Sequence, residues 1–292
     1  MKTNFWVLPA IMAMVMFGTV SSSCSSNDED DESLLDYYDF EVDGFYFDIV
    51  SLGEATCMIS ARQNNQHSKG NVTIPATVNY GGRELKVVEI GGWLFRDCPD
   101  LTGIAIPNTV TRIEEYAFAD CTHLMDVVIP SSMTYIGFAA FQNCASLVNV
   151  TLPDGMTELG NWMFSGCASL MNVTLPNGVT ELGNAMFEGC VSLKTISIPN
   201  SVTTLGVNLF KGCTGLTNVT LGNSVTMIKH EAFATCNSLT TLYSLNLTPP
   251  SIDGYCFTNN HYMTLNVFVP KEALAAYQNA DGWKDFWHLQ GI

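Results

Sequence analysis

The chain has 292 residues, of which 47% are hydrophobic and 14% charged, so it can bury a sizeable core and is neither disordered nor fibrous. Its formal net charge is −16, which argues against a duplex nucleic-acid partner, because such binding depends on cationic contacts to phosphate. Ten acidic residues lie between Asp28 and Asp48, whereas residues 101–238 contain nine acids and four bases. The acidity therefore belongs mainly to the N-terminal region.

Residues 1–23 have the features of an export signal. Phe5 to Val20 is an uncharged run of 16 residues, which is short for a membrane span and fits the apolar region of such a signal. The small residues Ser21–Ser23 lead into Cys24, which resembles the cleavage site of a bacterial lipoprotein. The resemblance implies that Cys24 becomes the lipidated first residue, although Ser21 stands where that family usually has leucine.

Residues 24–37 are predicted to form a solvated acidic tether, because they contain the uninterrupted acidic run Asp28–Glu32. An acidic run just behind a lipidated cysteine resembles the surface-export signal of lipoproteins from the Bacteroides group. The resemblance implies an exported outer-membrane lipoprotein that faces the outside of the cell, while the periplasmic leaflet stays open as the alternative.

Three residue types recur at an interval of 23 residues through most of the remaining chain. A period between 20 and 30 residues is typical of a leucine-rich solenoid. The cysteines are Cys98, Cys121, Cys144, Cys167, Cys190, Cys213 and Cys236, the phenylalanines are Phe95, Phe118, Phe141, Phe164, Phe187, Phe210 and Phe233, and the prolines are Pro107, Pro130, Pro153, Pro176 and Pro199, with Gly222 in the sixth place.

One unit, residues 170–192, shows what each repeat should form. Val173 and Leu175 alternate with polar residues, which predicts a short strand with one buried face. Pro176–Gly178 is a turn signal, and a second short extended piece ends after Leu182. Ala185–Cys190 fits one helical turn, with its Phe and Cys three residues apart on the inner side.

A single repeat should not fold alone. About seven apolar positions contribute on the order of 10–20 kcal/mol, and ordering 23 residues costs roughly as much or more in conformational entropy. Stacked repeats can fold because each covers the edges of its neighbour. The fold class is therefore predicted as a β-rich α/β repeat solenoid, a right-handed leucine-rich-repeat superhelix of about seven to eight coils.

The pattern Lxx(I/V)x(I/L)PxxVxx(I/L)GxxAFxxC resembles the Treponema-type leucine-rich repeat of BspA-like bacterial surface proteins over residues 72–270. The resemblance implies a solenoid over residues 72–264, an N-terminal β cap over 38–71 and a C-terminal strand-and-helix cap over 265–292. The first coil carries an insertion after Pro75, in which Tyr80–Arg83 predicts a hairpin turn.

Ten cysteines in an exported chain suggest disulfides, but the ladder argues against them. Equivalent side chains in adjacent coils are parallel and about one strand spacing apart, which is poor geometry for an S–S bond. The seven ladder cysteines are therefore predicted to be small buried core residues. A metal site would need close cysteine pairs or a neighbouring histidine, so none is predicted. Cys57 and Cys256 lie outside the ladder, and only burial is predicted for them.

The sequence shows no catalytic motif, and no enzyme activity and no cofactor are predicted. The five histidines have neither ligand spacing nor a neighbouring nucleophile motif. Glu158 and Glu181 occupy the same repeat position and could imitate an acid pair, but they are interpreted as surface charge.

Two rows of the repeat are candidates for a ligand-binding surface. Asn149, Asn172 and Asn218 each begin an Asn-Val-Thr triplet, which reads either as a glycosylation sequon or as a polar ladder on the outer sheet face, and the ladder is preferred. The position two residues before each phenylalanine contains Trp93, Tyr116 and Trp162. These rings would serve binding or would pack partly against neighbouring coils, and Tyr135 and Phe138 belong to the same region.

The leading hypothesis is a non-catalytic cell-surface lipoprotein that binds an extracellular partner. The BspA-like resemblance implies adhesion to a host matrix protein, to mucin or to another bacterium. The alternative is a glycan-capture accessory protein that uses Trp93, Tyr116 and Trp162 as platforms. A passive spacer with no ligand is the third reading, and the sequence does not choose among partners.

Overall fold

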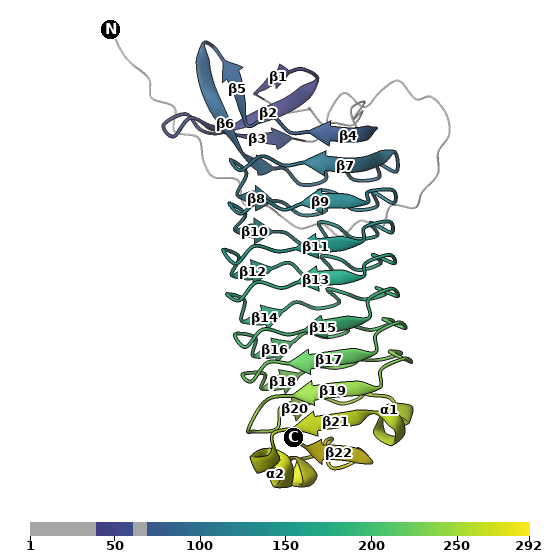
Figure 1. The fold of residues 1–292 in the computed structure, drawn as a ribbon. Coiled ribbons are helices and arrows are strands. Elements are labelled where there is room, and N and C mark those ends of the chain that lie inside the picture. The colour runs from purple at the N-terminus through teal and green to yellow at the C-terminus, as the bar shows by residue number, and fades with distance from the viewer. Residues whose placement is uncertain (1–38, 61–68) are drawn as a thin grey trace. The chain divides into compact units, whose positions relative to one another are not determined.

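The computed structural model describes residues 39–60 and 69–292, which belong to one compact unit. The predicted export signal, Cys24 and the acidic tether lie outside the described residues. Within them the repeats form a solenoid of stacked coils, which confirms the predicted fold class (Figure 1).

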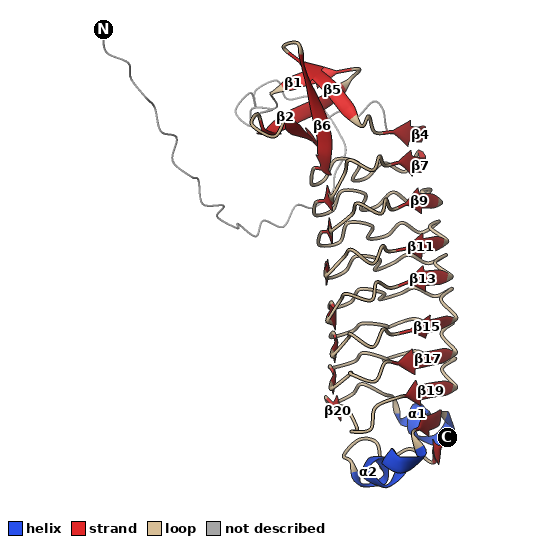
Figure 2. Ribbon diagram, turned by 60° about the vertical axis from the view of Figure 1, so that its left-hand side comes forward, coloured by secondary structure: helices blue, strands red, loops and turns tan. Residues whose placement is uncertain are grey.

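Each coil except the last contributes one strand to each of two rows, and strands of one row pair mostly in parallel with the neighbouring coil (Figure 2). The first row gives nine coils, one or two more than predicted. This row contains β4 (Gly70–Thr73), β7 (Leu101–Ala105), β9 (Asp126–Val128), β11 (Asn149–Thr151), β13 (Asn172–Thr174), β15 (Thr195–Ser197), β17 (Asn218–Leu221), β19 (Thr241–Ser244) and β21 (Asn266–Val269).

The second row runs along the other side of the coils and consists mostly of two-residue strands. Register is kept by the 23-residue step, as in the pairing of Tyr135 with Glu158. The row contains β6 (Arg83–Ile90), β8 (Arg112–Ile113), β10 (Tyr135–Ile136), β12 (Glu158–Leu159), β14 (Glu181–Leu182), β16 (Thr204–Leu205), β18 (Met227–Ile228) and β20 (Ser251–Ile252).

Additional elements cover both ends of the coil stack. β1 (Phe40–Val42), β2 (Phe45–Ser51) and β3 (Thr56–Ser60) form antiparallel pairs, and β3 then joins β6 in parallel. β5 (Thr77–Tyr80) and β6 form the predicted hairpin, whose two turn residues are glycines with φ of 58° and 81°. The C-terminal end contains α1 (Asn259–Thr264), the short 3₁₀ helix η1 (Lys271–Ala273), α2 (Leu274–Asn279) and β22 (His288–Gly291).

The helical turn predicted over Ala185–Cys190 is wrong. Ala185 and Gly189 have φ of 51° and 73°, which a right-handed helix does not allow. Their N–H groups donate to the carbonyls of Val207 and Lys211 in the next coil, at 2.8 Å each, rather than within their own turn. The inter-coil bonds hold residues 185–190 in two successive turns, which we call a double turn, in place of a helix. Helices occur in the described residues only from Asn259 onward.

The core is a stack of phenylalanine rings with a column of thiols beside it. Consecutive rings from Phe95 to Phe257 have centroids 5.1–5.8 Å apart and planes within 18° of parallel. The ladder cysteines from Cys121 to Cys236 are buried free thiols. Each donates to the carbonyl of the phenylalanine 26 residues earlier, at 2.9–3.2 Å. Burial raises the pKa of the Cys167 thiol to about 12, so it is protonated at neutral pH and can donate.

Cys57 and Cys256 are also buried, but outside this column. The Cys256 thiol lies 2.9 Å from the carbonyl oxygen of Lys229 and 2.7 Å from that of Asp253. The Cys57 sulfur is 3.6 Å from the carbonyl oxygen of Lys86. Both thiols therefore contact backbone carbonyls near the two ends of the coil stack.

Both rows of strands are interrupted, at levels one coil apart. The ladder through β12 resumes at β14, and the ladder through β13 resumes at β15. Glu158 and Glu181 occupy equivalent positions on the two sides of the first interruption, where like charges destabilise strand pairing. The double turns still bridge it, because the N–H of Phe164 donates to the carbonyl of Met186 at 2.9 Å. The Phe164 and Phe187 rings also stay stacked, with centroids 5.8 Å apart, so the core and the turns continue across this interruption.

Replacing Cys167 with alanine should lower the free energy of unfolding by about 2 kcal/mol, because it removes a buried donor and leaves a small cavity. Urea unfolding would measure the change. Cys167→Ser, which keeps a donor, and Cys167→Val, which keeps the volume, should each lose less. An unchanged midpoint and slope for the alanine variant would show that the thiol column does not stabilise the stack.

Candidate functional site

A cluster of rings with one guanidinium lies on the surface of the first coils. We call Trp93, Arg96, Tyr116 and Phe138 the aromatic patch. Trp93 and Tyr116 occupy the first left-handed position of their double turns, with φ of 65° and 54°. This conformation costs about 1–2 kcal/mol for a residue with a side chain, and inter-coil bonds hold it: the N–H of Tyr116 donates to the carbonyl of Phe138 at 2.9 Å.

The members of the aromatic patch contact one another directly. The ring centroids of Trp93 and Tyr116 are 4.4 Å apart, and those of Tyr116 and Phe138 are 5.3 Å apart. The Arg96 guanidinium carbon lies 4.4 Å from the Trp93 ring centroid and 5.5 Å from that of Tyr116. Trp93 is nevertheless 43% exposed and Phe138 37% exposed. The rings therefore pack against neighbouring coils and also present a continuous apolar surface.

The structure separates Trp162 from this patch. Trp162 occupies the same repeat position, but the intervening coil has the buried Ala139 there. Tyr135 lies on the neighbouring strand β10, where the Arg112 guanidinium carbon is 4.2 Å from its ring centroid. Of the three rings named from the sequence, only Trp93 and Tyr116 come together.

Acidic side chains surround the cations near the patch. Arg96 is 3.5 Å from the Asp97 carboxylate, and Arg112 is 2.7 Å from that of Glu114. Burial and the nearby Glu114 charge raise the pKa of Glu89, although Arg112 opposes the shift. The aromatic patch is thus surrounded by ion pairs, and neither positive nor negative charge dominates near it.

The asparagine row lies on the outer face of the first row of strands, as the polar-ladder interpretation requires. Asn149 and Thr151 are exposed on either side of the buried Val150, and the Asn172 amide donates to Oδ1 of Asn149 at 2.8 Å. Asn218 is exposed at the same position of β17. In contrast, Asn246, which begins a further sequon, is only 4% exposed and is a poor glycosylation acceptor.

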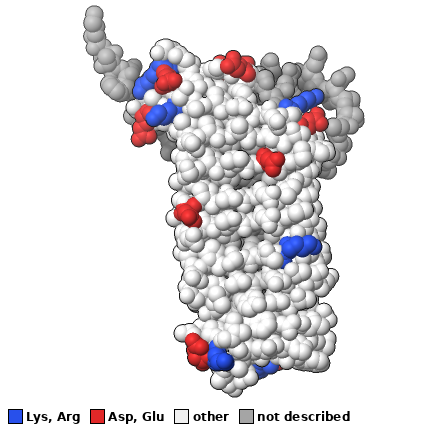
Figure 3. All heavy atoms as spheres, in the orientation of Figure 1, with Lys and Arg blue, Asp and Glu red and all other residues white. Residues whose placement is uncertain are grey.

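Apolar side chains interrupt this polar face, which the sequence reasoning missed. Val128 is 76% exposed, Met125 49% and Met171 50%. A shallow hollow of about 480 Å³ lies beside Val128 and Asn149. The sequence does contain a signal for these exposed apolar side chains, because methionine and valine replace polar residues at these repeat positions in some coils. Figure 3 shows that the face of the coils seen there carries few charged side chains.

A family profile for the BspA type leucine-rich repeat region, with six copies, matches residues 88–217 and 136–266. The chain belongs to the BspA-type leucine-rich repeat family. Among curated proteins, a search found no match.

Two solved structures support this family membership. A leucine-rich repeat protein of T. pallidum is 30% identical, with a TM-score of 0.59, over 67% of this chain and 87% of that one. A leucine-rich cell surface protein of Faecalibacterium prausnitzii is 25% identical, with a TM-score of 0.56, over 79% of this chain and 75% of that one. The chain thus has a BspA-type repeat scaffold similar to that of bacterial surface proteins.

The described part of this BspA-type chain offers little for chemistry. It contains no group of three or more His, Cys, Asp or Glu side chains that could hold a metal ion, and none of its helices is long and apolar enough to span a membrane. Burial lowers the pKa of His261, whose Nε2 lies 2.9 Å from the Cys236 carbonyl oxygen. Glu158 and Glu181 are exposed and line a shallow hollow of about 420 Å³ at the interruption of the strands.

Glu89 should make folding pH-dependent in one direction. Because its pKa is raised in the folded protein, the folded state binds more protons than the unfolded state over that pH range, and stability falls as the pH rises through it. Glu89→Gln should therefore be more stable than the parent at pH 7, by a difference that shrinks on acidification. Urea unfolding at several pH values would test this, and a difference independent of pH would contradict it.

Proposed function

We propose that the protein is a cell-surface lipoprotein whose repeat scaffold binds an extracellular protein through the aromatic patch and so mediates adhesion. The observation that carries the proposal is the contact between Trp93, Tyr116 and Arg96 on an exposed surface. Tryptophan, tyrosine and arginine are the residue types most enriched among those that dominate protein–protein binding energy. A host matrix protein, a mucin or the surface of another bacterium is the expected partner class.

The geometry of the patch favours a protein partner over the glycan-capture alternative. A sugar that stacks on an aromatic platform needs an open ring face. Arg96 and Tyr116 both lie against the Trp93 ring, and Phe138 packs against Tyr116. Trp162, the third ring of that alternative, lies apart from them. What remains is a mixed surface of partly exposed rings and a guanidinium, which suits a protein interface.

The proposed location rests on the N-terminal segment and on one relative. The uncharged run before Cys24 and the acidic run after it fit a lipid-anchored, exported protein. The similar protein of F. prausnitzii is described as a cell surface protein. A repeat scaffold held outside the cell on a tether could reach large partners.

The double variant Trp93→Ala/Tyr116→Ala should lose binding by about tenfold or more, because it removes the two anchoring rings. The purified protein would be used in pull-downs from host matrix, mucus and bacterial envelopes, followed by titration of the recovered partner. Trp162→Ala removes a ring at the same repeat position outside the patch and should bind like the parent. Recovery of nothing from all three sources, or equal binding by all variants, would refute the proposal.

Protease added to intact cells should degrade the protein, whereas a periplasmic marker in the same cells should survive. Cys24→Ala should abolish incorporation of labelled fatty acid into the chain, because the lipid attachment point is gone. Protection of the protein in intact cells would place it behind the outer membrane and remove large extracellular partners.

A further inference from the structure

The last complete coil departs from the repeat template on the side of the second row. Ile228 pairs with Ile252, 24 residues later, whereas the corresponding residues of the preceding coils are 23 apart. The added length lies in the loop 245–250, whose sequence is LNLTPP. This loop does not follow the contour of the segment 222–227 in the coil before it, and a hollow of about 600 Å³ lies between them.

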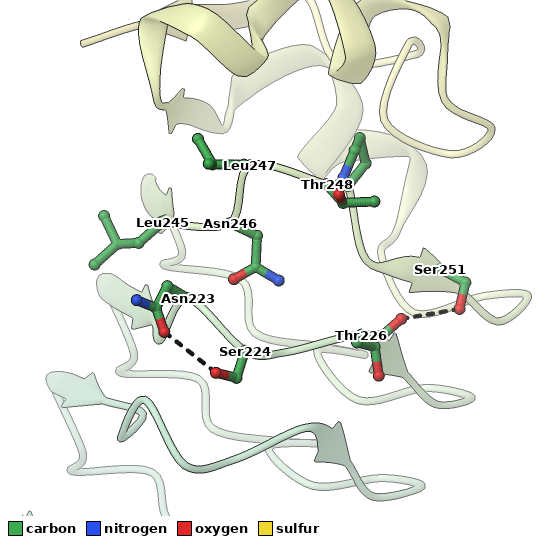
Figure 4. Close-up of a pocket in the computed structure, with 9 residues that line it drawn as sticks. Asn223, Ser224, Thr226, Leu245, Asn246, Leu247, Thr248 and Ser251 are labelled. Carbon is green, nitrogen blue, oxygen red and sulfur yellow. Dashed lines mark hydrogen bonds between the residues drawn. The ribbon is translucent and has the colours of Figure 1, made fainter.

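Nine residues line the hollow, eight from these two segments and Ser251 just after the loop, and Figure 4 shows the two segments running along its two sides. None of the nine is charged. Its volume lies within the range of about 300–1,000 Å³ that is usual for small-molecule sites. The lining residues are Asn223, Ser224, Thr226, Leu245, Asn246, Leu247, Thr248, Pro249 and Ser251.

The C-terminal cap holds the loop in place from behind. The Tyr277 hydroxyl donates to the backbone carbonyl of Asn246 at 3.2 Å, and the Trp283 indole N–H donates to that of Pro250 at 2.7 Å. The Asn246 amide nitrogen donates to the carbonyl of Val225 in the preceding coil. Two adjacent prolines further restrict the backbone. The hollow is therefore preformed rather than dependent on closure around a ligand.

The polar groups of the hollow act mainly as hydrogen-bond acceptors. Oδ1 of Asn246 has no hydrogen-bond partner among the described residues, and the residue is only 4% exposed. Its side chain points into the space between the two segments (Figure 4). The hydroxyls of Ser224, Thr226 and Ser251 already donate to Asn223 Oδ1, Thr203 O and Thr226 O, so they are left as acceptors. A matching ligand must supply several donors of its own.

We infer that this hollow binds a neutral saccharide. Sugar hydroxyls supply closely spaced donors without charge, and the hollow has no charged side chain to neutralise an ion. The C–H face of a sugar ring would lie against Leu245, Leu247 and Pro249, and Leu247 is otherwise an apolar side chain left 62% exposed. A divalent cation fits less well, because it prefers carboxylates to neutral oxygens alone. The site is independent of the aromatic patch, which lies in the first coils.

Ligand-observed NMR would be run on the purified protein with glucose, galactose, mannose, fucose, N-acetylglucosamine and N-acetylgalactosamine as probes. At least one should bind saturably. The double variant Ser224→Ala/Thr226→Val should weaken this binding by about tenfold or more. Ser201→Ala/Thr203→Val alters the same repeat positions one coil earlier, where Thr203 makes the equivalent bond to Thr180 O, and should bind like the parent. If a double variant does not fold, the single variants Ser224→Ala and Ser201→Ala replace the two double variants in this comparison.

Failure of every sugar to bind, or equal weakening by the two double variants, would overturn the inference. Binding of an uncharged Gly-Ser-Asn peptide at this hollow instead of any sugar would overturn the ligand class. Trp93→Ala/Tyr116→Ala should leave sugar binding unchanged, so loss of the proposed protein adhesion and loss of this site can be told apart.

Discussion

Hydrogen bonding between coils at a fixed step of 23 residues is the constraint on which the rest of the structure depends. From Trp93 to Gly212, each double turn places two residues in left-handed conformations whose N–H groups point to the next coil, as Ala185 and Gly189 do toward Val207 and Lys211. The Phe141 carbonyl accepts both the Cys144 N–H of its own turn and the Cys167 thiol of the following coil. Cysteine suits this position because it is small and apolar and still donates.

The same register that aligns the core also aligns the surface. Where two neighbouring coils have rings at one position, as Trp93 and Tyr116 do, the rings come into contact and form a patch that neither coil could make alone. Where two neighbours have carboxylates, as at Glu158 and Glu181, like charges face one another and the strand ladder is interrupted. Surface residues of a solenoid must therefore be read in columns, because each side chain has an equivalent directly above and below it.

The period, the ring and thiol columns and the N-terminal hairpin could be predicted because they depend only on spacing and turn chemistry. The helical turn could not, since a three-residue spacing of Phe and Cys suits both a helix and the observed double turn. Glycine usually signals a left-handed residue, but the first such position contains Trp, Tyr, Ala, Asn or Glu in this chain. Trp162 was grouped with Trp93 by its shared repeat position, although Ala139 in the intervening coil separates it from Tyr116. The hollow at Asn246 follows from one added residue, whose effect depends on the packing of the cap.

The two candidate sites lie near opposite ends of the coil stack. The middle coils present nearly the same polar face, so a ligand that binds this face would bind several coils equally well. Specific recognition needs an arrangement of side chains that does not recur in every coil, and both candidate sites meet this condition. The aromatic patch lies in the coils that follow the inserted hairpin, and the hollow lies where Tyr277 and Trp283 of the C-terminal cap hold an irregular loop. The C-terminal cap thus has a second consequence beyond shielding the end coil, because its hydrogen bonds hold a loop that departs from the repeat template.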